Sequence, residues 1–80
     1  MTNTKDKPVE TIVIRMVKAE IMETETENGK HYRVTFSSLY KDGEEWQESE
    51  SYGRDDLPIL SKVADIAYSK VHELSQENTN

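Results

Sequence analysis

The sequence predicts an α+β domain, a four-stranded antiparallel β-meander followed by one long C-terminal α-helix. Up to about residue 52, apolar residues alternate with polar ones, a period typical of half-buried strands. Asn28-Gly29 and Asp42-Gly43 interrupt this region, and both pairs are strong hairpin signals. After residues 53–58 the apolar residues recur at helical spacing, from Leu57 to Leu74.

Length and composition predict a single small domain. The chain has 80 residues, 34% of them hydrophobic, and no cysteine. It is therefore near the lower size at which one core stabilises a fold without disulfides. Such domains often gain the missing burial by association, so we expect a homodimer. We also expect a disordered leader over residues 1–8, a folded domain over 9–75 and a disordered tail over 76–80.

The charge balance is acidic, with a net charge of −6 and a pI near 4.8. Proteins that bind nucleic acid usually carry a basic stripe, so this balance argues against a general affinity for polyanions but allows a local patch. The longest apolar run, Ile12-Val13-Ile14, is too short to cross a membrane. No signal-peptide pattern follows the N-terminal lysines. We therefore expect a cytoplasmic protein.

The first two strands are expected over residues 11–17 and 18–26. In the first, both faces contain apolar residues, as in a central strand or one at a dimer contact. A two-residue type I′ turn at Asn28-Gly29 would place Ile21 opposite Phe36 and Glu23 opposite Val34. Alternation explains Glu20, Glu23, Glu25 and Glu27 as a solvated strand face.

The second hairpin brings the aromatic residues onto one face. A two-residue turn at Asp42-Gly43 would place Leu39 opposite Trp46 and Arg33 opposite Tyr52. Leu39 is out of phase with its strand, which predicts a bulge near Ser37-Ser38 or a twist that re-aims the strand end. Trp46, Glu48, Glu50 and Tyr52 would then share the face of Arg33, with Ser49 and Ser51 on the core face.

The helix should begin at Asp55 or Asp56, either of which can accept hydrogen bonds from the first turn. Pro58 is tolerated there, and the helix should end at about residue 74 or 76. Its apolar arc is broader than one sheet face requires, which indicates a second chain. The predicted dimer interface consists of Ile59, Val63, Ile66 and Tyr68.

The sequence offers no catalytic or metal-binding motif. His31 and His72 are the only histidines, and neither has a second ligand at a suitable spacing. No nucleophile elbow or glycine-rich oxyanion loop accompanies the serines. We therefore expect no metal, no cofactor and no enzymatic activity.

One constellation has a plausible function, because aromatic side chains stack on unpaired bases while cations contact phosphates. Its nucleic-acid-binding candidates are Arg15, Lys18, Arg33, Trp46 and Tyr52, with Tyr40 as a further aromatic. The alternative is that Trp46 and Tyr52 cover the rim of a thin sheet. Arg33 would then pair with Glu48 or Glu50.

Several segments resemble a family of short, uncharacterised bacterial proteins across about residues 11–73. They are TETENG (24–29), VTFS (34–37), LYKDG (39–43), GRDDL (53–57) and KVAD (62–65), with Trp46. The topology also resembles the transcriptional-coactivator and Whirly-type single-stranded-DNA-binding fold. That resemblance implies dimerisation through helices and binding of single strands on a curved sheet.

The leading hypothesis is therefore a small, non-enzymatic, dimeric module that binds single-stranded nucleic acid or regulates transcription. The alternative is an acidic protein-interaction module. It would engage a basic partner or accept a strand at an open sheet edge.

Overall fold

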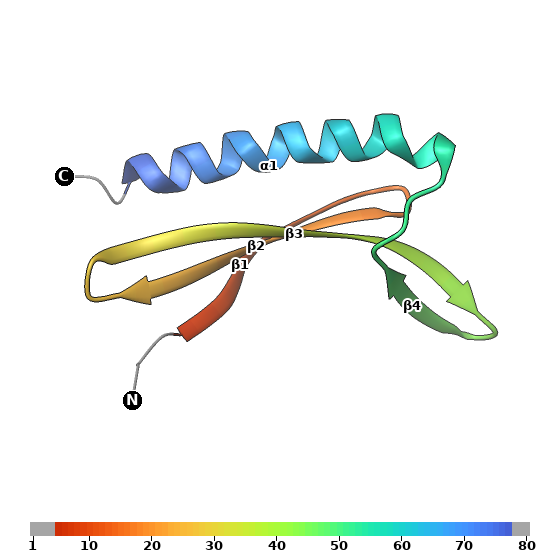
Figure 1. Cartoon of the computed structure of the whole chain (residues 1–80), viewed down its shortest axis with the longest axis horizontal. Helices are drawn as coiled ribbons and strands as arrows, with labels where there is room; N and C mark the ends of the chain where they lie inside the picture. The colour runs from red at the N-terminus through yellow and green to blue at the C-terminus, as the bar shows by residue number, and fades with distance from the viewer. Residues whose placement is uncertain (1–4, 78–80) are drawn as a thin grey trace.

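The computed structural model describes residues 5–77 and confirms the predicted fold class (Figure 1). Four strands form one antiparallel sheet in chain order: β1 (Lys5–Ile14), β2 (Val17–Thr26), β3 (Gly29–Asp42) and β4 (Glu45–Ser49). A short 3₁₀ turn, η1 (Arg54–Asp56), leads into the helix α1 (Leu57–Glu77). The helix lies along one face of the sheet, here the covered face, and leaves the outer face open (Figure 1).

The folded region is longer at both ends than the sequence predicted. Residues 5–8 belong to β1, so the expectation of a disordered leader is wrong for them. The helix ends at Glu77, inside the expected tail. The polar N-terminal segment has no apolar alternation, yet Asp6 and Lys7 form ion pairs with side chains of the sheet. Residues 1–4 and 78–80, the rest of the expected leader and tail, lie outside the described residues.

A turn through Arg15 and Met16, which was not predicted from the sequence, separates the first two strands. Arg15 has a positive φ of 55°. Met16, the other loop residue, does not have a positive φ. This combination is typical of a type II′ turn, in which glycine usually occupies the position of Arg15. The sequence has no Gly, Asn or Pro here to mark the reversal. β1 is also an edge strand rather than a central one.

The β2–β3 hairpin is paired two residues away from the predicted register. The chain reverses through Glu27 and Asn28, and Gly29 follows with a φ of 119°. Ile21 consequently lies opposite Val34 rather than Phe36. Because side chains alternate with period two, this shift leaves every residue on its predicted face.

The β3–β4 hairpin is also shifted by two residues, but in the opposite direction, because its turn lies one residue later than predicted. Gly43, with a φ of 68°, and Glu44 form the turn, so that Leu39 lies opposite Glu48. β4 ends at Ser49, so the predicted pairing of Arg33 with Tyr52 does not form.

β3 extends beyond β2, and its far end forms the hairpin with β4. It pairs with β2 over residues 29–38 and with β4 over 38–42, without a register shift near Ser37. The predicted bulge is therefore wrong, and the sheet's irregularity lies between Pro8 and Glu10. The β3–β4 hairpin curves away from the helix (Figure 1), in agreement with the alternative of a twisted strand end.

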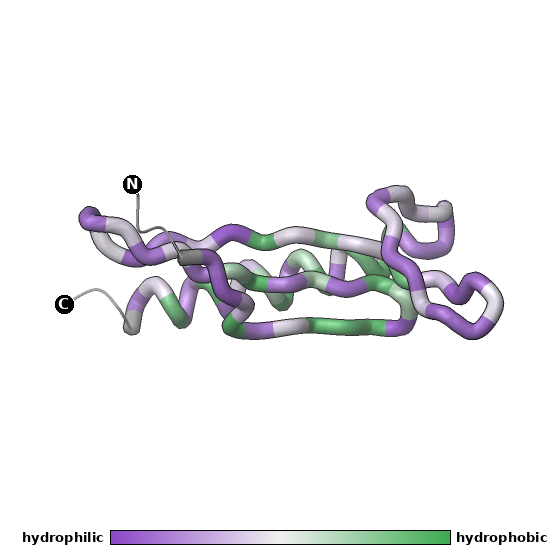
Figure 2. Tube along the Cα trace, turned by 90° about the horizontal axis from the view of Figure 1, so that it is seen from below, coloured by the Kyte–Doolittle hydropathy of each residue, from purple (hydrophilic) through white to green (hydrophobic). Residues whose placement is uncertain are grey.

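The core lies between β2 and the helix. Apolar and polar segments alternate along the strands when the sheet is seen from its outer side (Figure 2). The fully or almost fully buried apolar residues are Val17, Ala19, Ile21, Val63 and Ala67. Ile12, Ile14, Val34, Phe36, Ile59 and Leu60 pack around the core and are partly buried. Full burial of the larger side chains, Val17, Ile21 and Val63, contributes about 1.5–3 kcal/mol each.

Two polar contacts fix the segment between β4 and the helix. The buried Ser38 hydroxyl donates to the Ser51 carbonyl oxygen at 2.7 Å, although Ser51 itself is exposed and not on the core face. The Asp56 carboxylate accepts from the Gly53 N–H at 3.2 Å. The predicted capping carboxylate thus bonds to the residue before the 3₁₀ turn rather than to the first turn of the helix.

Candidate nucleic-acid-binding surface

Several apolar and cationic residues of the outer face lie at the end that carries the β3–β4 hairpin. The register sets Val13 beside Lys18 and Lys41 beside Trp46, while the Leu39 N–H donates to the Met16 carbonyl oxygen at 2.7 Å. Val13, Met16 and Trp46 are 51%, 46% and 56% exposed. We call this surface the outer patch, and it consists of Val13, Arg15, Met16, Lys18, Lys41 and Trp46.

Trp46 is the central aromatic residue of the outer patch. The Lys41 ammonium lies 5.9 Å from the centroid of its indole ring, within the range of a cation–π contact. The predicted register separated Lys41 from Trp46, so Lys41 was not a predicted site residue. Its proximity follows from the two-residue shift of the hairpin, which brings a cation next to a ring that remains exposed.

Lys18 belongs to the outer patch but is already paired with a carboxylate. Its ammonium lies 2.8 Å from Glu48 Oε2, and the Ser37 hydroxyl donates to Glu48 Oε1 at 2.9 Å. The hydrogen bond from Lys18, and then that from Ser37, lowers the pKa of Glu48. The same contact with Glu48 raises the pKa of Lys18. A phosphate at this position must displace Glu48.

Arg33 lies on the outer face but far from Trp46. Eight residues of β3 separate Arg33 from Lys41, the partner of Trp46, or roughly 26 Å at the usual rise of a strand. The Arg33 guanidinium lies 2.6 Å from Asp6 Oδ2, and the Thr24 hydroxyl also donates to Asp6. The Thr24 hydrogen bond, followed by that of Arg33, lowers the pKa of Asp6. Arg33 thus pairs with Asp6, and not with Glu48 or Glu50 as in the alternative prediction.

Tyr52 does not join the outer patch. It lies half-buried in the segment between β4 and η1, past the last paired residue of β4. Burial, and secondarily the charge of Glu50, raises the pKa of the Tyr52 phenol. Of the predicted candidates, the structure thus places Lys18 and Trp46 at the same end of the outer face, with Arg15 in the adjoining β1–β2 turn, and it places Arg33 and Tyr52 elsewhere.

A shallow depression of about 240 Å³ adjoins the outer patch. Lys18 is its only cationic lining residue, whereas Glu20, Glu48 and Glu50 all contribute carboxylates. This balance of charge repels an anion. A phosphate is therefore better accommodated at the exposed Lys41 than inside the depression.

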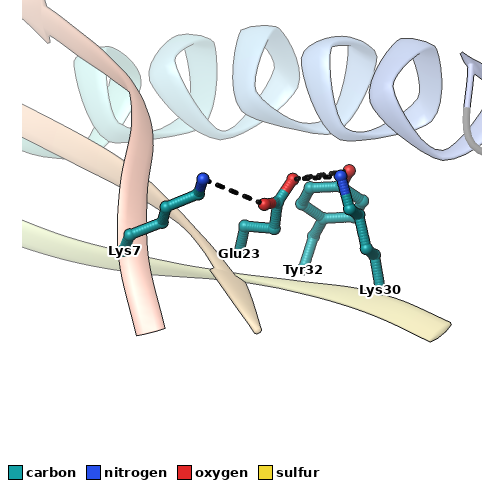
Figure 3. Close-up of polar contacts among 4 residues, drawn as sticks. All are labelled: Lys7, Glu23, Lys30 and Tyr32. Atoms are coloured by element: carbon teal, nitrogen blue, oxygen red, sulfur yellow. Dashed lines mark hydrogen bonds and ion pairs between the residues drawn. The ribbon is translucent and has the colours of Figure 1, made fainter. Parts of the chain in front are cut away.

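A second polar cluster lies on the covered face, where Glu23 is only 8% exposed (Figure 3). The Tyr32 hydroxyl donates to its carboxylate at 3.1 Å, and the Lys7 and Lys30 ammonium groups lie 3.8 and 3.9 Å away. The prediction that Glu23 belongs to a solvated face is therefore wrong. A buried carboxylate needs such partners because desolvation disfavours an isolated charge.

The four predicted dimer residues do not form one exposed surface. Val63 is fully buried in the chain's own core, and Ile59 packs against that core. Ile66 is half-buried, whereas Tyr68 is 71% exposed and stacks on His72 with ring centroids 6.3 Å apart. Of these residues, Tyr68 alone presents most of its side chain to solvent.

Within residues 5–77, His, Cys, Asp and Glu side chains form no group of three or more that could hold a metal ion. No helix in this part of the chain is long and apolar enough to span a membrane. No family model, curated protein or solved structure matches this chain. The resemblance to the coactivator and Whirly-type fold therefore stays a prediction.

Proposed function

We propose that this chain is a small, non-enzymatic module that binds single-stranded nucleic acid through the outer patch, acting as a homodimer in the cytoplasm. The observation that carries the proposal is the exposed Trp46 ring with the Lys41 ammonium beside it. An exposed aromatic ring offers a stacking platform to any unpaired base, and an adjacent cation attracts the phosphate that follows it. Bases inside a duplex are already stacked, so the proposal favours single strands.

The backbone at Arg15 supports the same surface. A φ of 55° is unfavourable for a residue with a β-carbon, at a cost of about 1–2 kcal/mol. Arg15 forms no ion pair with the described residues, unlike Lys18 and Arg33. Its guanidinium therefore stays available for a phosphate at the edge of the outer patch.

The carboxylates that pair with Lys18 and Arg33 set the expected strength of binding. A phosphate gains little from a cation that must first leave Glu48 or Asp6. Binding should therefore be weak and sensitive to salt, because few counterions are released.

The test is a titration of fluorescently labelled oligo(dT) and of a duplex at low and moderate salt. Trp46→Ala should weaken oligo(dT) binding by about 1–3 kcal/mol, the usual value of one base–aromatic stack. Tyr40→Ala is the matched control, because Tyr40 is similarly exposed at 48% but one residue out of phase with Lys41 on the same strand. Equal losses in both variants, or no binding at low salt, would refute the proposal.

The alternative function, an acidic protein-interaction module, is favoured by the depression lined by Glu20, Glu48 and Glu50. A lysine-rich peptide should then bind where oligo(dT) does not. Glu48→Gln should weaken that peptide's binding, whereas on the nucleic-acid proposal the same change frees Lys18 and strengthens oligo(dT) binding.

A further inference from the structure

Residues 5–8 form a weakly held end of β1, which we call the β1 arm. A register irregularity between Pro8 and Glu10 separates the arm from the rest of the strand. Residues 6–8 are exposed, and Pro8 has no N–H to donate to a neighbouring strand. The arm is held by its backbone pairing with β2 and by polar side-chain contacts. A short edge segment of this kind, without buried apolar side chains, opens at a low free-energy cost.

Two hydrogen-bond donors of the outer face converge on the carboxylate of Asp6, in the β1 arm. The Arg33 guanidinium lies 2.6 Å from Asp6 Oδ2, and the Thr24 hydroxyl donates to Asp6 Oδ1. The side chain of His31 is close by, because His31 lies directly opposite Thr24 in the register. A guanidinium and a hydroxyl are also the donors with which proteins contact the oxygens of a phosphate. When Asp6 moves away, these side chains form an anion site.

The surroundings of Arg33 favour an anion once the β1 arm is displaced. On the outer face Arg33 lies opposite Met22, and its neighbours along β3 are His31 and Thr35. None of these neighbours is a carboxylate. Lys18 differs in this respect, because the depression beside it is lined by three glutamates. Arg33 is therefore the paired cation of the outer face at which a phosphate meets less repulsion.

We propose that Asp6 occupies a phosphate site of the outer face, and that a bound nucleic-acid strand takes over this site when the β1 arm gives way. Each phosphate of the strand carries one negative charge, as the carboxylate does, so the exchange leaves the charge of the site unchanged. The strand is the one held at Trp46, so the site rests on the proposed function.

A tethered strand, rather than free phosphate, is the ligand because Asp6 belongs to the same chain as Arg33. A group tethered this closely acts at a high effective concentration, which free phosphate in solution does not match. A strand held at Trp46 has the same advantage, since its following phosphates are tethered too. Arg33 and the partner of Trp46 are eight residues apart on β3, or roughly 26 Å at the usual rise of a strand. Only a strand that spans this distance reaches both.

Asp6→Asn tests the site, because an amide oxygen binds a guanidinium less strongly than a carboxylate does. The variant should bind an oligo(dT) of about 16 nucleotides, long enough for an extended site, about three- to fivefold more tightly than wild type, the factor that corresponds to one exposed ion pair. An oligo(dT) of about four nucleotides is too short to reach Arg33 from Trp46 and should bind both proteins equally.

Glu25→Gln is the matched control for the change in net charge. It removes one carboxylate at the same end of the sheet, but Glu25 follows Thr24 on β2 and therefore points to the other face. Its affinity for the long oligonucleotide should stay close to that of wild type, because salt screens a charge that lies away from the strand. A thermal melt of each variant verifies folding.

Arg33→Gln separates the site from a general effect of charge. In the double variant Asp6→Asn/Arg33→Gln the gain in affinity should disappear, because no guanidinium remains to receive the phosphate. Inorganic phosphate, at the same total phosphate concentration, should not displace the long oligonucleotide from Asp6→Asn. A gain that persists in the double variant, that Glu25→Gln reproduces or that the short oligonucleotide shares would overturn the inference, as would displacement by inorganic phosphate.

The phosphate site and the proposed function fail in different ways. If Asp6→Asn binds the long oligonucleotide equally well after Trp46→Ala, the Arg33 site is retained and the stacking role of Trp46 is lost. If Trp46→Ala weakens binding but Asp6→Asn gains nothing, the proposed function is retained and Asp6 is only an ion-pair partner of Arg33. No binding of the long oligonucleotide by Asp6→Asn at low salt would refute both.

Discussion

The two faces of the sheet use charge in opposite ways. On the covered face the buried carboxylate of Glu23 is held by two lysines and a tyrosine. On the outer face the charges neutralise one another in exposed pairs, Lys18 with Glu48 and Arg33 with Asp6. A charge on the covered face thus needs partners because it is buried. On the outer face, the cations without an ion pair determine which ligands can bind.

This difference predicts where substitutions change stability and where they change binding. Exposed ion pairs contribute about 0–1 kcal/mol each, so the outer face should tolerate changes to its charges. The covered face should not tolerate changes to its apolar residues, because a cavity in a close-packed core is costly. Adjacent residues of β2 point to the two faces in turn and allow a direct comparison.

Ile21→Ala should give the largest loss of stability. Ile21 is fully buried on the covered face, and truncation of such a residue costs about 2–5 kcal/mol through lost burial and the cavity left behind. Met22→Ala, one residue along on the outer face, should cost clearly less because Met22 is only half-buried. Urea denaturation measures both, and equal losses would mean that the outer face is also covered in solution.

The faces of the sheet could be predicted from the sequence, but the register could not. Alternation places Ile21, Val34 and Phe36 on one face in any register shifted by two residues. The turn residues did not distinguish between the two registers. Gly29 has its positive φ after the turn, whereas the prediction placed it within the turn. The Arg15 turn was missed for a related reason, since no glycine marks it.

Within the candidate site, the sequence predicted correctly only those residues whose position follows from the alternation of the strand. Trp46 lies on the expected face and is exposed, as the alternation indicated. Lys41 depends on the register, and Tyr52 depends on where β4 ends, so sequence reasoning missed the first and misplaced the second. The partners of Glu23 come from two other strands, Lys7 from β1 and Lys30 and Tyr32 from β3, and no local pattern indicates such a cluster.

Glu23→Ala should give the next largest loss of stability, about 1–3 kcal/mol. It leaves the Tyr32 hydroxyl without its carboxylate acceptor and two ammonium groups without their counter-charge. Glu23→Gln should lose less, because the amide oxygen can still accept from Tyr32. The control is Glu25→Ala on the same strand, exposed and expected to stay within about 0.5 kcal/mol of wild type. An unchanged midpoint for Glu23→Ala would mean that the covered face is open to water at this end.

Arg15→Gly should give the smallest change in stability, and the opposite sign. Glycine adopts a φ of 55° without strain, so the variant should gain about 0.5–1 kcal/mol in free energy of unfolding. It also removes an unpaired guanidinium from the outer patch, so oligo(dT) binding should weaken and its salt dependence should decrease. Arg15→Ala separates the two effects, because it removes the charge but keeps the β-carbon that makes this backbone conformation unfavourable. Weaker binding in both variants, with a gain in stability for glycine alone, would show that the chain retains a strained turn because the arginine binds. A gain in stability without any loss of binding would leave Arg15 outside the interface and restrict the cations of the outer patch to Lys18 and Lys41.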